Sequence, residues 1–417
     1  MTPSHPSSSP STQNHPDDVT SLLRHASLVR FLIARVGSIS AQQMLMLAIS
    51  WHMYDLTSSA WDLGLVGLFQ FVPGLATTLI AGHCADRLHR GRMVAACLAL
   101  QAVVATLLIV STATHSVTRD VLLTLSLVLG AIRPFQMTGQ QALLPMLVPP
   151  RLLARSMALS TVVQQISVIA GPALGGVLFA VSVGTVYLTS ALLFCISAVM
   201  YAFVRYDYTP PSREPATADT ILAGLRFIWG SPLLLGAISL DLFAVLFGGA
   251  TALLPVYAKQ ILHVGPQGLG LLRSAPAMGA LCIGLVLSRR AIVSGVGKKL
   301  LIAVAVYGVS IAAFGLSRWF PLSLLLLAVS GGADTISVIV RQTLIQLETP
   351  DHMRGRVAAV NTLFIGASNQ LGEFESGVSA TALGVVGSVV AGGFATVLIS
   401  VAWSRLFKPL ATRDALH

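Results

Sequence analysis

Charged residues are scarce in this sequence. Only 10% of the 417 residues are charged, whereas 54% are apolar and the mean hydropathy is +0.79. An ordinary soluble domain has roughly a quarter charged residues, because a globule in water must cover its apolar interior with polar surface. The composition therefore largely excludes soluble enzymes and nucleic-acid-binding proteins, and it indicates a polytopic membrane protein.

Several patterns that carry chemistry are also missing. The four cysteines, Cys84, Cys97, Cys195 and Cys282, lie far apart without a metal-ligand spacing, so we expect small core residues and no metal site. No Ser-His-Asp arrangement, His-Glu-x-x-His pattern or phosphate-binding loop occurs, which predicts neither an enzyme nor a cofactor. Residues 1–27 lack the apolar run of a secretory signal, and we interpret them as a disordered cytoplasmic tail.

Long apolar segments dominate the rest of the chain. A helix needs about 20 apolar residues to span a bilayer. The segments predict an all-α membrane protein with twelve transmembrane helices in two pseudo-symmetric six-helix bundles. The expected spans are 28–54, 60–83, 92–111, 120–146, 155–180, 184–204, 232–258, 267–288, 299–317, 321–347, 355–382 and 384–405.

The basic residues predict the orientation of these spans. With a cytoplasmic N-terminus, 19 of the 26 lysines and arginines fall in cytoplasmic segments, 3 in outer loops and 4 inside spans. Such an excess on one side is typical of the cytoplasmic face. We therefore expect a multi-pass protein of the cell (inner or plasma) membrane with both termini in the cytoplasm. The net charge of +10 then requires no nucleic-acid partner.

The chain divides around its longest internal loop. That loop is Pro-rich at first, as in an extended linker, and residues 221–229 form a possible amphipathic helix on the membrane surface. The expected order is a tail (1–27), the N-terminal bundle (28–204), the cytoplasmic linker (205–231), the C-terminal bundle (232–405) and a cytoplasmic tail (406–417).

The two halves also resemble each other in sequence. At an offset of 201 residues, one register matches shared Gln, Pro, Arg and Gly positions. Two homologous bundles place a substrate path between them, near the middle of the bilayer. The matches include Gln141 with Gln342, Pro149 with Pro350, Arg155 with Arg356, Gly171 with Gly372 and Gly176 with Gly377.

A basic loop follows the second expected span. Gly82, Asp86, Arg87 and Arg90 match the Gly-x-x-x-Asp-Arg signature loop of the major facilitator superfamily, although His89 stands where that family usually has Gly. The loop thus resembles that superfamily's gating loop. We expect Gly82 to let two helices approach closely and the arginines to face anionic lipid headgroups.

The same loop suggests a gate. Asp86 lies near a helix start, where the helix dipole favours a carboxylate. We expect it to contact Arg354 and Arg356 at the cytoplasmic start of the eleventh span, as a latch that closes the inner mouth. The second half keeps a reduced copy of the loop, with Ser288 in place of the aspartate.

Further motifs resemble those of proton-driven exporters. The run Gly171-Pro172-Ala-Leu-Gly175-Gly176 resembles the core of an antiporter motif, although a simple packing kink is the alternative. Arg133 with Gln136 resembles the Arg-x-x-Gln of drug–proton antiporters. Segments 341–346, 350–357 and 364–377 resemble the branch of the superfamily that contains the enterobactin exporter.

Ionisable residues inside the spans are the main functional candidates, because a charge there is costly. An acid without a cation can carry a proton, whereas a fixed ion pair that holds helices together is the alternative for each residue. Besides Arg273, the candidates for the proton-coupling site or the substrate cavity are Asp241, Asp334, Glu373, Glu375, Arg35, Arg133 and Arg341.

Asp241 is the preferred coupling acid from sequence. It lies about nine residues, roughly 13 Å, into its span, and its sequence neighbours offer no cation. Asp334 and Arg341 are seven residues apart, so they share a helix face without touching. Glu373 and Glu375 are two residues apart and point to different sides of a helix.

The resemblance implies a proton-driven transporter that works by alternating access. Export of small amphipathic molecules, such as drugs or a siderophore, is the preferred direction, with protons and membrane lipids as further partners and a monomer as the working unit. A uniporter or importer of a small solute or lysophospholipid is the alternative within transport. A polytopic membrane enzyme or scaffold is the alternative outside transport, and it would need a catalytic cluster that the sequence does not offer.

Overall fold

The fold is that of a helical membrane protein. We describe a computed structural model covering residues 25–204, 206, 218–290, 294–350 and 353–414. Within these ranges the chain forms helices and contains no β-strand. The predicted Pro-rich part of the linker and most of the N-terminal tail lie outside the described residues.

The N-terminal half contains six long helices. Ser59, Thr118 and Ser182 cap three of them by accepting hydrogen bonds from backbone N–H groups of the first turn. The helices are α2 (Ala26–Thr57), α3 (Ala60–Arg87), α4 (Arg90–Ala113), α5 (Arg119–Leu143), followed by η1 (Leu144–Met146), α6 (Pro150–Phe179) and α7 (Val183–Ala202).

The C-terminal half repeats this pattern with one broken span. Its first helix, α9 (Pro232–Gly248), continues as short turns of different pitch: η2 (Ala250–Leu253), α10 (Leu254–Val256) and η3 (Tyr257–Ile261). The helices that follow are α11 (Pro266–Arg289), α12 (Val296–Leu316), α13 (Phe320–Glu348), α14 (Arg354–Leu406) and α15 (Lys408–Ala411).

Ten helices of the described chain are long and apolar enough to cross a membrane. One of them, α14, has 53 residues, about 80 Å at 1.5 Å per residue, which exceeds twice the thickness of a bilayer core of about 30 Å. Gly384 interrupts it with φ 72° and ψ 164°, so α14 makes two spans that meet where the sequence predicts a break. With α14 counted as two spans, the ten helices make eleven spans. The predicted twelfth span is α3, which has 28 residues but is not among the ten.

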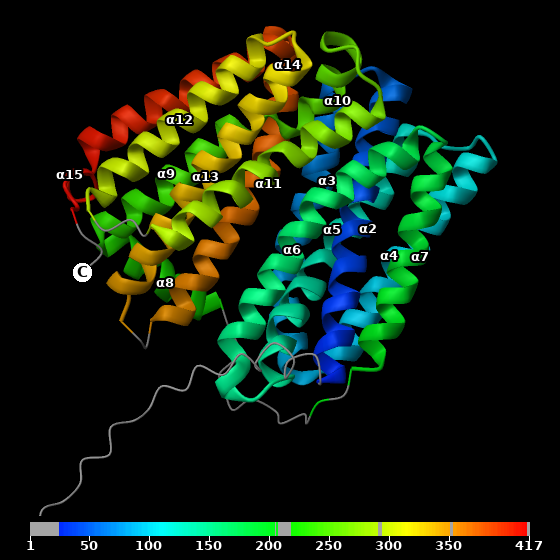
Figure 1. Cartoon of the computed structure of the whole chain (residues 1–417), viewed down its shortest axis with the longest axis horizontal. Coiled ribbons are helices and arrows are strands. Elements are labelled where there is room, and N and C mark those ends of the chain that lie inside the picture. The colour runs from blue at the N-terminus through cyan, green and yellow to red at the C-terminus, as the bar shows by residue number, and fades with distance from the viewer. Residues whose placement is uncertain (1–24, 205, 207–217, 291–293, 351–352, 415–417) are drawn as a thin grey trace, which may run out of the picture.

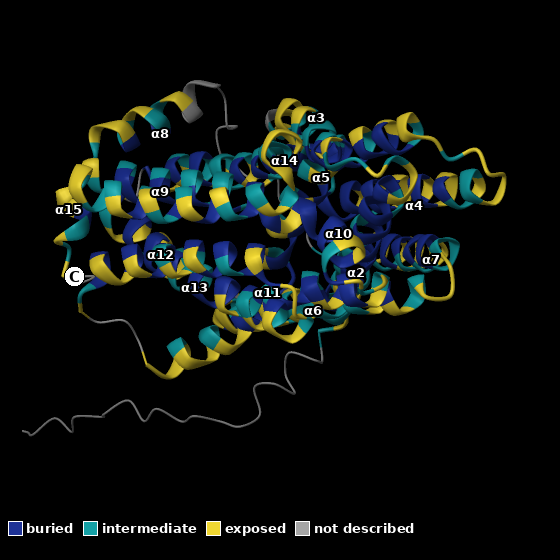
Figure 2. Cartoon of the chain, turned by 90° about the horizontal axis from the view of Figure 1, so that it is seen from above, coloured by how far each residue is buried: buried dark blue, intermediate teal, exposed yellow. Residues whose placement is uncertain are grey.

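The long helices form two groups, α2–α7 and α9–α14, that lie side by side (Figure 1). Buried residues face the interior of the molecule, and exposed residues lie along its outer faces (Figure 2). Many of those exposed residues are large and apolar, for example Leu107, Val177 and Leu398. Such a surface suits lipid rather than water.

Two segments outside the spans are packed against the C-terminal group. Helix α8 (Ala218–Gly230) is longer than predicted, and its Gly224 touches the backbone of Arg356 at the start of α14. Ile228 is buried, whereas Leu222 and Trp229 remain exposed. The prediction of a helix lying on the membrane surface is therefore incomplete, because one face of α8 covers α14.

The C-terminal segment is also anchored. Leu410 of α15 is fully buried, and Arg413 forms an ion pair with Glu348 at 2.7 Å. The Asp414 carboxylate accepts a hydrogen bond from the backbone N–H of Gly295 at 3.0 Å. The segment thus links the adjoining ends of α12 and α13.

Candidate functional site

The two helix groups touch through glycines at one end of the molecule. We call this end outer, because the sequence predicts that it lies outside the cell. A Cβ added to Gly64 of α3 would lie 3.0 Å from the Cα of Gly377 in α14. A Cβ added to Gly176 of α6 would lie 3.2 Å from the Cα of Gly270 in α11. The backbones of the two groups are therefore in direct contact at both crossings.

Side chains add to this outer contact. Asp55 at the end of α2 forms an ion pair with Lys259 in η3, and Trp61 of α3 packs on Phe374 of α14 with ring centroids 5.7 Å apart. Lys259 is one of the three basic residues that the sequence places in outer loops. The pair was missed because 204 residues separate its members along the chain.

Several glycines toward the opposite, inner end have open space beside them, whereas others, such as Gly91 and Gly297, are packed within their own helix group. A Cβ added to Gly82, Gly284, Gly355 or Gly366 would meet no atom within 4 Å. The expectation that Gly82 brings two helices together is therefore wrong for this conformation, in which the groups close at the outer end instead.

A charged cluster lies between the groups. A Cβ on Gly67 of α3 would come 3.0 Å from Oε2 of Glu373 on α14, so this carboxylate faces the other group. Its charge interacts with those of Arg133 on α5 and Arg273 on α11. Arg273 Nη2 also donates to Ser50 Oγ of α2 at 2.9 Å. Charges on helices of both halves thus face one another across the boundary, although the described residues show no ion pair between Glu373 and either arginine.

A second cluster lies inside the C-terminal group. Asp241 of α9 forms an ion pair with Arg341 of α13, and both side chains are buried. The prediction that Asp241 has no cation nearby is therefore wrong. Its partner lies 100 residues away in sequence, and the packing of α13 against α9 brings the two together.

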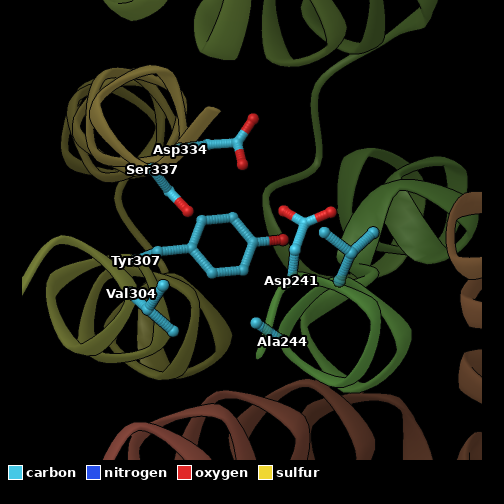
Figure 3. A pocket seen from close by; sticks show the side chains of 7 residues that line it. Asp241, Ala244, Val304, Tyr307, Asp334 and Ser337 are labelled. Atoms are coloured by element: carbon cyan, nitrogen blue, oxygen red, sulfur yellow. The ribbon is translucent and has the colours of Figure 1, made fainter. Parts of the chain in front are cut away.

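Asp334 of α13 shares the environment of this pair. Its charge interacts with those of Asp241 and Arg341, but it forms no ion pair with Arg341, as the seven-residue spacing predicts. Figure 3 shows the Asp241 and Asp334 carboxyl groups on the same small cavity, beside the ring of Tyr307. The Tyr307 hydroxyl donates to the Gly248 carbonyl at 2.9 Å. Two carboxyl groups therefore lie near one guanidinium, which pairs directly with Asp241.

The remaining intramembrane candidates lie apart from these clusters. Arg35 Nη2 donates to Gln164 Oε1 at 2.5 Å within the N-terminal group. Glu375 is associated with Ser379 on its own helix, away from the cations around Glu373, as the two-residue spacing predicts. Gln136, on the same helix as Arg133 of the first cluster, accepts a hydrogen bond from Gln101 at 2.7 Å.

The predicted gating loop contains one misassigned arginine. Arg90 is 7% exposed, and it donates to the Ala85 and Ala142 carbonyls at 3.1 and 3.0 Å. It therefore satisfies carbonyl groups at the ends of α3 and α5 and does not face lipid headgroups, whereas Arg87 is exposed. The side chain of Asp86 lies outside the described residues, so its predicted contact with Arg354 and Arg356 stays a prediction.

His89 replaces the usual glycine of the loop without strain. Its φ of −64° does not require glycine, and its Nδ1 accepts a hydrogen bond from the Arg92 backbone N–H at 3.4 Å. Partial burial, reinforced by the charge of Arg92, lowers the pKa of His89. The ring therefore stays in the neutral, accepting form that caps α4.

The glycine-proline motif of α6 packs on both of its faces. A Cβ on Gly171 would lie 2.8 Å from Gln43 of α2, and a Cβ on Gly175 would lie 3.2 Å from Met44 of α2. Gly176 faces α11 of the other group, as described above. Ser274 Oγ of α11 also donates to the Ile169 carbonyl at 2.6 Å. The motif therefore lies at the α6–α11 crossing between the halves, with Pro172 inside the helix.

Comparisons with known proteins agree with this architecture. Residues 31–373 match the family model described as Major Facilitator Superfamily. The multidrug efflux pump Tap of Mycolicibacterium fortuitum is 26% identical over 398 residues, covering 91% of this chain and 95% of that protein. The enterobactin exporter EntS of Citrobacter koseri is 26% identical over 389 residues, covering 91% of this chain and 92% of that protein.

Solved structures with low sequence identity share the fold. A mutant of the nucleoside transporter NupG has a TM-score of 0.72 at 14% identity, covering 91% of this chain and all of that one. A bacterial homologue of the human lysosomal transporter Spinster, in an inward-facing and occupied conformation, has a TM-score of 0.68 at 13% identity. The match covers 95% of this chain and 97% of that one. The chain is a membrane-embedded transporter that belongs to the major facilitator superfamily.

Proposed function

We propose that this transporter uses the proton gradient to export small amphipathic molecules by alternating access. The observation that carries the proposal is the cluster of Glu373, Arg133 and Arg273, in which one acid has cationic neighbours from both halves. A group at such a boundary changes its surroundings whenever the halves move, which is what coupling requires.

The coupling is electrostatic. Two unit charges near a protein surface attract each other by on the order of 4 kcal/mol at 4 Å, and this attraction weakens in proportion as the distance grows. Among the described residues, Glu373 and Arg133 form no ion pair within 4.0 Å, so the attraction between them is smaller than that. Movement of Arg133 away from Glu373 removes part of this attraction for the ionised carboxylate only. The two conformations then bind the proton with different affinities, and each 1.4 kcal/mol of difference corresponds to about tenfold.

Access to Glu373 supports the same role. In this conformation its carboxylate is packed against Gly67 at the closed outer contact. If the termini are cytoplasmic, the structure is the inward-facing state, and separation of α3 from α14 would expose Glu373 to the outside. A proton taken up there and released inward would accompany substrate moving outward.

Asp241 is assigned a structural role in this proposal, because Arg341 neutralises it directly. Asp334 is the second candidate for the coupling acid, since it lies near the cation that pairs with Asp241. The export direction and the substrate class are carried over from the relatives, a multidrug efflux pump and an enterobactin exporter, and the working unit is proposed to be a monomer.

The test is accumulation of a panel of drugs and siderophores in cells with and without the protein. We expect lower accumulation of at least one compound, reversed by a protonophore. Glu373→Gln should abolish the effect, whereas Glu375→Gln, two residues away on another face of the helix, should retain it. Higher accumulation with the protein would favour the importer, and insensitivity to the protonophore would refute proton coupling.

A further inference from the structure

A groove runs along the side of the C-terminal group, and the residues that line it all belong to that group. Helices α11 and α12 form its walls and α13 its floor. On the floor, Gly332 lies against α11, where an added Cβ would come within 2.8 Å of Ile283. Small residues thus let α13 pack closely against α11 beneath the groove, and apart from its inner end the lining is almost wholly apolar.

The inner end of the groove is cationic. Arg290, just past α11, and Lys299, in the first turn of α12, line it, and both side chains are exposed. The described part of the chain gives neither residue an ion pair, and residues 288–300 contain four basic residues and no acid. An apolar channel therefore ends at two positive charges without protein counter-ions.

The length of the groove matches one lipid leaflet. From Met278 to Arg290 the wall of α11 covers twelve residues, about 18 Å at 1.5 Å per residue. Half of the hydrocarbon core measures about 15 Å. A lipid whose headgroup lies at the Arg290 end therefore reaches with its acyl chain to Met278, near the bilayer middle.

We propose that this groove binds one anionic phospholipid of the inner leaflet, with its phosphate at Arg290 and Lys299 and one acyl chain over α13. Basic pockets between transmembrane helices on the cytoplasmic side suit anionic headgroups. The charge of the site selects an anionic over a zwitterionic lipid, and its apolar walls select a lipid over a free phosphate ion.

The chain supplies its own probe and control. Cys282 lines the groove and is exposed, and Cys195 is exposed on α7, outside the groove. Both would be labelled with N-ethylmaleimide in delipidated protein in detergent, with added phosphatidylglycerol or phosphatidylcholine of the same chains. Peptide mass spectrometry follows each cysteine separately. We expect phosphatidylglycerol to slow labelling of Cys282 but not of Cys195, and phosphatidylcholine to act much more weakly.

Matched double variants test the headgroup site. Arg290→Gln with Lys299→Gln should raise the concentration of phosphatidylglycerol needed for half-protection by about 30-fold. Each basic residue contributes about 1 kcal/mol near an anionic surface, and the two together make about 2 kcal/mol, at about tenfold per 1.4 kcal/mol. Arg289→Gln with Lys298→Gln removes the same charge from residues that do not line the groove. It should change the concentration of phosphatidylglycerol needed for half-protection by less than about threefold.

Several results would overturn the proposal. Equal protection by both lipids, or protection that survives Arg290→Gln with Lys299→Gln, would mean ordinary annular lipid. Protection that depends on protein concentration without lipid would mean that a second copy of the chain covers the groove. Failure of Cys282 to react in delipidated protein would mean that the groove is closed. Unchanged Cys195 labelling and elution volume show that each variant is folded.

Discussion

The ion pair between Asp241 and Arg341 gives the sharpest test of which intramembrane charges stabilise the fold and which carry protons. Arg341 is 2% exposed and Asp241 is 5% exposed. Removing one partner of a buried pair costs about 3 to 5 kcal/mol, because the other charge is left uncompensated. Arg341→Met leaves two acids, Asp241 and Asp334, without the cation that lies near both. We therefore expect Arg341→Met to lower the free energy of unfolding by at least about 3 kcal/mol.

The double variant separates the pair from its surroundings. Asp241→Leu with Arg341→Met replaces the pair by apolar side chains, which is often neutral or stabilising. It should recover much of the lost stability, with a coupling energy of about 2 to 3 kcal/mol between the two sites. Unfolding of the purified protein in mixed detergent and dodecyl sulfate micelles measures these energies.

A more exposed pair serves as the control. Arg413 and Glu348 form an ion pair with side chains 32% and 31% exposed. Arg413→Met should cost less than about 1 kcal/mol, as is typical of exposed pairs. If Arg341→Met costs no more than Arg413→Met, or if the double variant is as unstable as the sum of its single changes, the assignment of Asp241 to a fixed pair is refuted.

The remaining predictions concern orientation and gating. A phosphatase reporter that is active only outside the cell should be inactive when fused after Arg213 or after His417, and activity at either site would overturn the orientation. Asp86→Asn should impair transport while leaving expression and substrate binding intact, and unchanged turnover would contradict the inner latch. Gly64→Leu should push the halves apart at the outer contact and increase the quenching of Trp61, which is 39% exposed in this conformation, whereas an unchanged Trp61 signal would contradict the close packing. Gly82→Leu should leave this conformation stable, because space surrounds Gly82, and a loss of stability would refute that reading.

The helices were predictable because hydropathy depends on local sequence. The break at Gly384 falls where the last two expected spans meet, and the cores of the predicted spans coincide with helices. Resemblance at the loop around Arg87, at residues 171–176 and within residues 341–377 was enough to indicate the family. Neither hydropathy nor the resemblance of short motifs depends on how the helices pack against one another.

The partners of the charged residues were not predictable in the same way. Arg341 reaches Asp241, and Lys259 reaches Asp55, only because distant helices pack side by side. Arg90 is likewise directed inward by carbonyl groups at the ends of neighbouring helices. Spacing within a single helix was informative, as for Glu373 and Glu375, because it requires no knowledge of packing.

The central claim is that proton movement and substrate movement are coupled through Glu373. The direct measurement is luminal pH in proteoliposomes that hold the purified protein, after addition of a compound identified by the accumulation screen. We predict substrate-driven proton flux in the wild type and in Glu375→Gln. Glu373→Gln should lose this flux and its dependence on the gradient while keeping exchange of labelled for unlabelled substrate. Substrate movement at the same rate with or without a pH gradient, or full proton flux in Glu373→Gln, would contradict the account.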